Sequence, residues 1–208
     1  MNELETYKSN LNKARNEKIN QKRLEFIEDY PVENIPDLTM EEYLFAKEGY
    51  GNPYSFCRRI SYGLNDLASV GNMVPDIFGI YLKDGTAITL SNSFEKFYGR
   101  NFESAFKKIK ELIFNLLNSF AEGDYDYYNT CDLHQSFKQR LLIVYYGDVL
   151  IPVTAENTIN GYCDALGLAY SKEDGYLDKN FLLFNCKKTD PELAKMSNID
   201  FMGFCDWL

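Results

Sequence analysis

Apolar residues recur at steps of three and four along the stretch from Asn101 to Gly123. This spacing places the side chains on one face of a helix. The residues are Phe102, Phe106, Ile109, Ile113, Leu116 and Phe120. Asn101 can cap the start of such a helix, and Gly123 stands where a left-handed C-terminal cap is expected. The pattern therefore predicts a long amphipathic helix over about residues 101–122.

Two strand-like runs precede this helix, Ile77–Leu82 and Thr86–Leu90. The residues between them are Lys83-Asp84-Gly85. Asp-Gly between apolar runs indicates a tight hairpin turn, because glycine adopts a positive φ without steric cost. We therefore predict a β-hairpin over about residues 77–90 that packs on the long helix.

Most of the remaining chain has a helical pattern. Residues 2–29 lack Gly and Pro, which favours a helix. Ser136–Tyr146 fits either a helix throughout or a helix that turns to strand near Leu142. Residues 189–192 (TDPE) are a start signal for a last helix, since proline suits the first helical position. The predicted class is α+β, predominantly helical, with a small antiparallel sheet built around the hairpin.

Length and charge set limits on the organisation and the partners. The 208 residues suffice for one sizeable core, and we predict a basic N-terminal helix or arm at residues 1–30 and a single globular α+β domain at residues 31–208. The net charge of −9 argues against a large basic face for duplex nucleic acid. Lys8–Arg23 nevertheless carries a net charge of +5, against −14 for the remainder. Such a segment suggests an anionic partner, and a solvated helix face is the ordinary alternative.

Cysteine and histidine usage gives no sign of a metal site or a cofactor. The five cysteines are odd in number and widely spaced, no CxxC pair exists, and His134 is the single histidine. The N-terminus is charged and no apolar run approaches the length of a membrane span. Reduced thiols fit a cytoplasmic protein best.

Two catalytic arrangements can be drawn, and the sequence pattern supports neither. Cys57 with His134, oriented by Asp132, would be a nucleophilic dyad, but a buried free cysteine is the commoner role. Asp124 and Asp126 could hold magnesium in a nuclease, yet the sequence shows no Asp…Glu-x-Lys constellation to accompany them. We therefore expect no catalytic residues and no enzymatic activity.

Four segments of the chain form an ordered set. They are RLEFIEDYPVENIPDLTMEEYLFA, SFCRRISYGLNDLASVGNMVPDIFGIY, FYGRNFESAFKKIKELIFNLL and YYGDVLIPVTAENTINGYCDALGL. Together they resemble the region in front of the AAA+ motor of McrB-type restriction proteins, over about residues 23–168. The resemblance implies a non-catalytic recognition module for bacterial antiviral defence, which contacts DNA or a phage-derived target and works with an AAA+ motor or another defence subunit. The 208 residues contain no GxxxxGK[ST] phosphate loop and hence no such motor.

Two segments depart from the family pattern. The family often has an aromatic–acidic pair after Ser-Phe-Cys, where this chain has Arg58-Arg59. It also tends to carry Gly-Gly-Ser with a nearby Lys before Phe-Gly-Ile-Tyr, where this chain reads GNMVPD at residues 71–76. If these positions form a recognition surface, this chain binds a different ligand.

Basic residues are the first candidates for contact with DNA, plain or modified. Arg58 and Arg59 stand beside Tyr54 and Tyr62, and arginine can bind phosphate while aromatic rings stack on bases. The full set is Tyr54, Arg58, Arg59, Lys107, Lys108, Lys110, Lys138 and Arg140, of which Lys107 and Lys110 lie off the apolar stripe and should face solvent. The competing function is a protein-interaction module that docks on a partner subunit through the acidic, Tyr-rich stretch 122–132 and the N-terminal helix.

Overall fold

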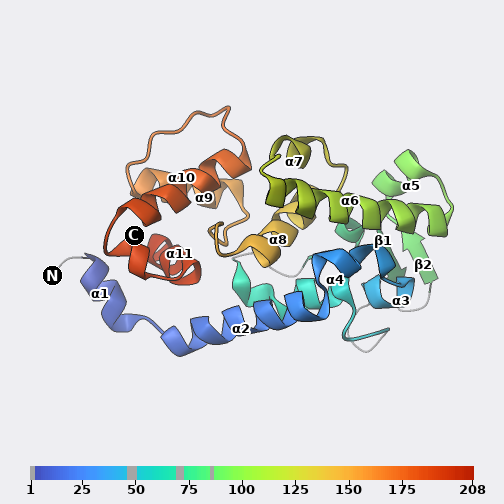
Figure 1. Ribbon diagram of the computed structural model, residues 1–208, viewed down its shortest axis with the longest axis horizontal. Helices are drawn as coiled ribbons and strands as arrows, with labels where there is room; N and C mark the ends of the chain where they lie inside the picture. Colours follow the sequence, from blue (N-terminus) through green and yellow to red (C-terminus); the bar gives the residue numbers. More distant parts are fainter. Residues whose placement is uncertain (1–2, 46–50, 69–72, 85–86) are drawn as a thin grey trace.

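The computed structural model describes residues 3–45, 51–68, 73–84 and 87–208. In this part of the chain, helices predominate and a two-stranded antiparallel sheet lies at one end of the molecule, so the predicted α+β class with helix predominating is confirmed (Figure 1). The α-helices are α1 (Glu3–Asn10), α2 (Lys13–Asp29), α3 (Met40–Tyr43), α4 (Phe56–Arg58), α5 (Asn92–Tyr98), α6 (Phe102–Glu122), α7 (Asp126–Thr130), α8 (Gln135–Tyr146), α9 (Glu156–Ala165), α10 (Tyr176–Thr189) and α11 (Asn198–Trp207). The strands and short turns are β1 (Ile80–Lys83), β2 (Ala87–Leu90), η1 (Val32–Asp37), η2 (Arg59–Gly63), η3 (Asn65–Leu67), η4 (Pro75–Phe78) and η5 (Leu193–Lys195). Among the described helices, none has the length and apolar character needed to span a membrane.

Helix α6 begins and ends where its capping residues predict. Asn101 Oδ1 accepts a hydrogen bond from the Ser104 N–H at 3.0 Å, and Gly123 closes the helix with a φ of 83°. The predicted apolar face is buried from Phe106 to Phe120. Phe102 is the exception, with 40% of its surface exposed, because it stands in the first turn before the helix meets the core.

The predicted hairpin is confirmed in its existence and its pairing. Strands β1 and β2 are antiparallel, with Ile80 opposite Leu90 and Lys83 opposite Ala87. Asp84 leaves β1 with a φ of 52°, the left-handed conformation that a tight turn requires. Gly85, the other turn residue of the prediction, lies outside the described residues.

The first strand is shorter than predicted. Residues 77 and 78 belong to the η4 turn, and the strand begins only at Ile80. Between them Gly79 has a φ of 78°, so the chain changes direction there. A Cβ at this position would lie 2.9 Å from the Phe94 ring, so only glycine fits both the backbone and the space.

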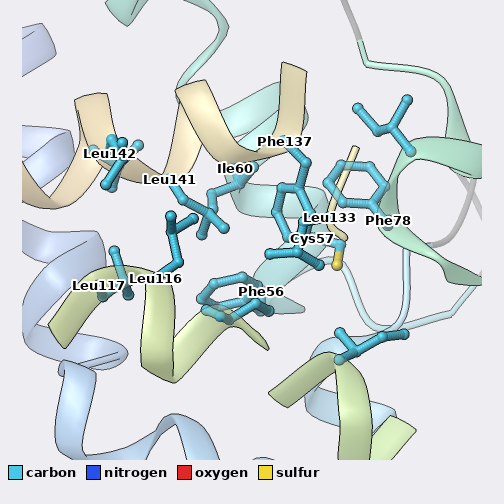
Figure 2. Packing of buried hydrophobic residues seen from close by; sticks show 14 of the residues in the cluster. Phe56, Cys57, Ile60, Phe78, Leu116, Leu117, Leu133, Phe137, Leu141 and Leu142 are labelled. Carbon is cyan, nitrogen blue, oxygen red and sulfur yellow. The ribbon is translucent and has the colours of Figure 1, made fainter. Parts of the chain in front are cut away.

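The main core lies where α4, α6 and α8 meet. Figure 2 shows Phe56 and Cys57 of α4, Leu116 of α6, and Phe137 and Leu141 of α8 in one cluster, each at most 1% exposed. Helix α8 is helical throughout, which settles the alternative that the sequence left open. Eight consecutive residues of α8 are buried, so this helix has no solvent face over its central turns.

The predicted helix over residues 2–29 is in fact two helices, because the chain breaks before Asn12, whose side chain caps α2. On α1, the Tyr7 ring lies 5.5 Å from Phe204 of α11. On α2, Phe26 is fully buried in the main core. The N-terminal segment therefore runs along the molecule, packed against it (Figure 1). A separate unit at residues 1–30 stays a prediction.

A second hydrophobic cluster is built from α9, α10, α11 and Leu4 of α1. The chain passes from the main core at Leu150 into this cluster at Ile151. At the crossing, the fully buried Asn180 accepts a hydrogen bond from the Ile151 N–H at 2.9 Å and donates one to the Ile151 carbonyl at 2.8 Å. One amide side chain thus fixes the passage between the two clusters.

The last helix starts later than predicted. Residues 189–192 produce only a turn, in which Asp190 Oδ1 accepts hydrogen bonds from the N–H groups of Glu192 and Leu193. The physical reason is that α10 continues to Thr189, so the start signal falls directly at its end. Helix α11 begins after Ser197, which is its N-cap.

Candidate nucleic-acid interface

Arg140 lies in the interior and not on a surface. It is 0% exposed, and its Nη1 donates to the Leu64 carbonyl at 3.0 Å. Burial lowers its pKa to about 10, since a low-dielectric environment disfavours the charged form. A side chain in this position cannot reach a phosphate from outside, so the prediction that Arg140 binds nucleic acid is wrong.

Lys138 is also buried, at 6% exposed. Its ammonium donates to the Tyr128 carbonyl at 2.7 Å and to the Cys131 carbonyl at 3.1 Å, and it lies 4.8 Å from the centre of the Tyr128 ring. It ties α8 to α7, which is a structural role, so this prediction is wrong as well. Both errors have one cause: α8 is enclosed on all sides over these turns, whereas a lone helix would expose its polar residues.

The lysines of α6 divide between solvent and structure. Lys107 is exposed, as predicted. Lys110 is partly buried, because its ammonium donates to the Pro36 carbonyl at 2.6 Å and the Leu38 carbonyl at 2.9 Å. It thereby closes the end of η1 and has only limited access to solvent. Lys108 lies 3.6 Å from the carboxylate of Glu111 on the same helix.

The remaining candidates gather at one place, which we name the basic–aromatic edge. It consists of Tyr30, Tyr54, Arg58, Arg59 and Tyr62. The Tyr30 hydroxyl donates to the Tyr54 carbonyl at 2.6 Å, and the Tyr54 side chain is 73% exposed. The guanidinium of Arg58 lies 5.1 Å from the centre of the Tyr62 ring, and that of Arg59 lies 5.7 Å from the Tyr30 ring.

The backbone beneath this edge has an uncommon turn. The Leu64 N–H donates to the Arg59 carbonyl at 3.0 Å, which makes a π-turn over Arg59–Gly63. The buried Phe56 anchors the preceding turn in the core. Turns of this type are frequent at functional sites, because the extra residue shifts the direction of neighbouring side chains.

An acidic residue already occupies part of the edge. Asp29, at the end of α2, forms an ion pair with Arg59. Burial raises the pKa of the Tyr30 hydroxyl; Arg59 opposes this rise, and Glu42 and Asp29 add to it. A phosphate that approaches Arg59 therefore competes with a carboxylate of the protein itself.

The catalytic alternatives gain no support from the geometry. Cys57 is fully buried, and burial raises the pKa of its thiol well above the ordinary value, which disfavours the nucleophilic thiolate. His134 is exposed and its Nδ1 accepts a hydrogen bond from the Ser136 N–H at the start of α8. Asp124 and Asp126 are exposed, and within the described ranges there is no group of three or more His, Cys, Asp or Glu residues that could hold a metal ion.

Sequence reasoning missed the surface between α2 and α11. Three hollows of about 560, 470 and 230 Å³ lie there. Asn16 lines the first and second, and Asn20 lines the first and third. Asn12, Asn16 and Asn20 are four residues apart, so a stripe of amides on one helical face was a visible signal for this surface.

Comparison of the chain with family models, with curated proteins and with solved structures found no match.

Proposed function

We propose that the chain is a non-catalytic recognition module of an McrB-type bacterial defence protein, and that it contacts DNA through the basic–aromatic edge. The observation that carries the proposal is the stacking of Arg58 and Arg59 on aromatic rings beside the exposed Tyr54. The ordered resemblance to the region in front of the AAA+ motor of such proteins supports the biological setting. The partner subunit in this proposal is an AAA+ motor or another component of the defence system.

The geometry of the edge suits a strand with accessible bases. An arginine that lies on a ring has fewer conformations to lose when it binds a phosphate oxygen. Tyr54 offers an open ring on which a base can stack, and such stacking tolerates any sequence. The exposed Lys107 on α6 is a further positive charge in the predicted set.

Fluorescence anisotropy tests the proposal with labelled duplexes, plain and cytosine-modified, and with the matching single strand, each at several salt concentrations. We expect salt-dependent binding that Tyr54→Ala weakens at every salt concentration, because the lost contact is stacking. Arg58→Ala/Arg59→Ala should reduce the slope of log affinity against log salt by about 2, one phosphate contact for each arginine.

Asp29→Asn provides a test in the opposite direction. This change removes the carboxylate that pairs with Arg59, so we expect tighter DNA binding. The matched control is Arg100→Ala, because Arg100 is an arginine with an 88% exposed side chain outside the edge. Absence of binding to any strand at low salt, or equal weakening by Arg100→Ala, would contradict the proposal.

The rival function is docking on a partner subunit through the acidic, Tyr-rich stretch 122–132 and the N-terminal helix. Tyr125 in this stretch is 41% exposed, although its ring packs 4.8 Å from Phe181, whereas Tyr128 is only 4% exposed. The exposed acidic residues there are Glu122, Asp124, Asp126 and Asp132. A chain that only docks on a protein subunit would bind none of the labelled strands, so the anisotropy series also separates the two functions.

A further inference from the structure

The smallest of the three hollows, about 230 Å³, lies where the start of α11 meets α2 and α10. Figure 1 shows α11 above α2, and α10 above α11, at the same end of the molecule. The residues that line this hollow include Asn20, Arg23, Lys187, Ser197, Asn198 and Ile199. These residues come from three helices that are far apart in the sequence, so the hollow exists only in the folded chain.

Lys187 is a largely buried cation whose ammonium has no direct acceptor in the described structure, although the Asp200 carboxylate acts on it from nearby. It is 8% exposed and lines the hollow. Over residues 3–45, 51–68, 73–84 and 87–208, no hydrogen-bond acceptor or ion-pair partner contacts its ammonium. Burial lowers its pKa, and Asp200 opposes this effect. Most of the side chain is buried, but its Nζ still reaches solvent, so an anion from solution can bind this partly desolvated ammonium.

Lys179, on the same helix, is a buried lysine with a carboxylate in direct contact. It is 2% exposed, and its ammonium lies 3.4 Å from the Glu156 carboxylate and 5.4 Å from the centre of the Tyr170 ring. Lys179 is therefore in direct contact with a carboxylate, whereas Lys187 is influenced by Asp200 without an ion-pair contact.

The first turn of α11 supplies further donors to the same hollow. Ser197 caps the helix by accepting hydrogen bonds from the N–H groups of Asp200 and Phe201, at 3.0 and 2.9 Å. The N–H groups of Asn198 and Ile199 come before the first intrahelical bond and have no acceptor in the described parts of the chain. Both residues line the hollow, at the positive end of the helix dipole.

We propose that this hollow binds a phosphate group, as inorganic phosphate or as a small phosphate monoester. Its oxygens would accept hydrogen bonds from the Lys187 ammonium and from the N–H groups of Asn198 and Ile199. Arg23 supports the site from α2: it is 2% exposed and its Nε and Nη1 are fixed by the side chain of Asn20 and the carbonyl of Val144, each at 3.0 Å. The site is independent of the basic–aromatic edge.

Two carboxylates border the site, and each already has a partner. Asp148 accepts a hydrogen bond from Arg23 at 2.8 Å and is 82% exposed, so it faces water. Asp200 accepts one from Asn16 at 2.6 Å and lines the neighbouring, larger hollow. The negative charges of Asp148 and Asp200 offset the positive charges of Arg23 and Lys187. Hydrogen bonds to the phosphate oxygens therefore provide most of the binding free energy.

Titration calorimetry of the full chain with inorganic phosphate, against chloride at equal ionic strength, tests the proposal. We expect phosphate to bind and chloride not to bind. Lys187→Met should weaken phosphate binding about tenfold or more, since it removes a charged hydrogen-bond donor. The unliganded variant should have a midpoint of thermal unfolding equal to or above that of the wild type, because a largely buried charge without a direct acceptor is gone. A purely structural lysine would lower that midpoint.

Lys179→Met is the matched control, a buried lysine of the same helix with its own carboxylate. We expect it to lower the midpoint of unfolding and to leave phosphate affinity unchanged. The double variant Arg58→Ala/Arg59→Ala should also leave the phosphate affinity unchanged, because both arginines lie in the basic–aromatic edge. This result would separate the phosphate site from the proposed DNA-binding site. If a nucleoside monophosphate binds more tightly than inorganic phosphate, the natural ligand of the hollow is a phosphate ester. If inorganic phosphate binds more tightly, the ligand is the free anion. Phosphate that binds no better than chloride, or that binds Lys187→Met as tightly as the wild type, would overturn the proposal.

Discussion

Buried basic side chains have different roles in this protein, according to the acceptors around them. Arg140 donates to the carbonyl of Leu64, and Lys138 donates to two carbonyls near the start of α8. Carbonyl oxygens compensate part of the desolvation of these cations, so they join helices together. Lys187 has no such acceptor in the described structure, which is why we assign it to ligand binding.

Arg140→Ala tests the structural role. We expect the free energy of unfolding to fall by about 3 kcal/mol or more, because the change leaves a cavity and removes the donor to the buried Leu64 carbonyl. Urea denaturation followed by circular dichroism measures this quantity. Arg100→Ala, at an 88% exposed side chain, should change it by less than about 0.5 kcal/mol. Equal losses in the two variants would contradict the structural assignment.

At the scale of elements, α1 is held to the C-terminal part of the chain by a small set of contacts. Glu192 accepts hydrogen bonds from Lys195 and from Lys8 of α1, the latter at 2.8 Å. Tyr7 donates to the Asp200 carbonyl at 2.9 Å, and its ring lies 6.4 Å from Trp207. Because Leu4 is the one buried residue of α1, and is itself 8% exposed, these polar contacts matter for the docking of this helix.

Docking of α1 should depend on acid pH. Lys195 and Lys8 hold the pKa of Glu192 at about 2 in the folded chain, below its ordinary value of 4.5. The contribution of Glu192 to docking is therefore complete above about pH 4.5 and is lost as the pH falls toward 2. The fluorescence of Trp207, the single tryptophan, reports on α1 through Tyr7 and should change in this range. In Glu192→Gln this change should be absent; its persistence would rule out Glu192 as the cause.

At the scale of the whole molecule, the basic N-terminal segment finds acidic partners within the chain itself. Lys8 pairs with Glu192, Arg23 with Asp148, and Arg15 lies 3.9 Å from Asp66. These ion pairs between the basic N-terminal segment and the acidic remainder of the chain thus help to hold α1 and α2 against the rest of the protein. The exposed Lys13, Lys18 and Lys22 keep their charge toward solvent.

The crossing between the two hydrophobic clusters depends on Asn180. Asn180→Ala leaves the N–H and C=O of Ile151 without their buried partners, so we expect a loss of about 2–4 kcal/mol in the free energy of unfolding. We also expect greater amide hydrogen exchange in α9–α11 than in α6 and α8. The control is Asn185→Ala on an exposed position of the same helix. Uniform exchange across both clusters would show that they unfold as one unit.

Local patterns were sufficient to predict much of the fold. The caps Asn101 and Gly123 and the apolar period between them define α6, since these interactions span at most four residues. The capping box of Thr39 and Glu42 at α3 is equally local. Gly79 shows the limit: its turn shortens β1, and the need for glycine comes from Phe94, a neighbour in space rather than in the β1 pattern.

The candidate sites were predicted less well than the elements, because exposure depends on what packs against a residue from elsewhere in the chain. The sequence by itself determined the class, the central helix with its hairpin, and the local caps, all of which follow from nearby residues and backbone geometry. Only the tertiary structure decided which cations are accessible. It enclosed Lys138 and Arg140 within α8, left Tyr54 and its arginines at the edge, and brought Lys187 to the start of α11. The physical reason is that burial and charge pairing are sums over distant segments, which no single stretch of sequence contains.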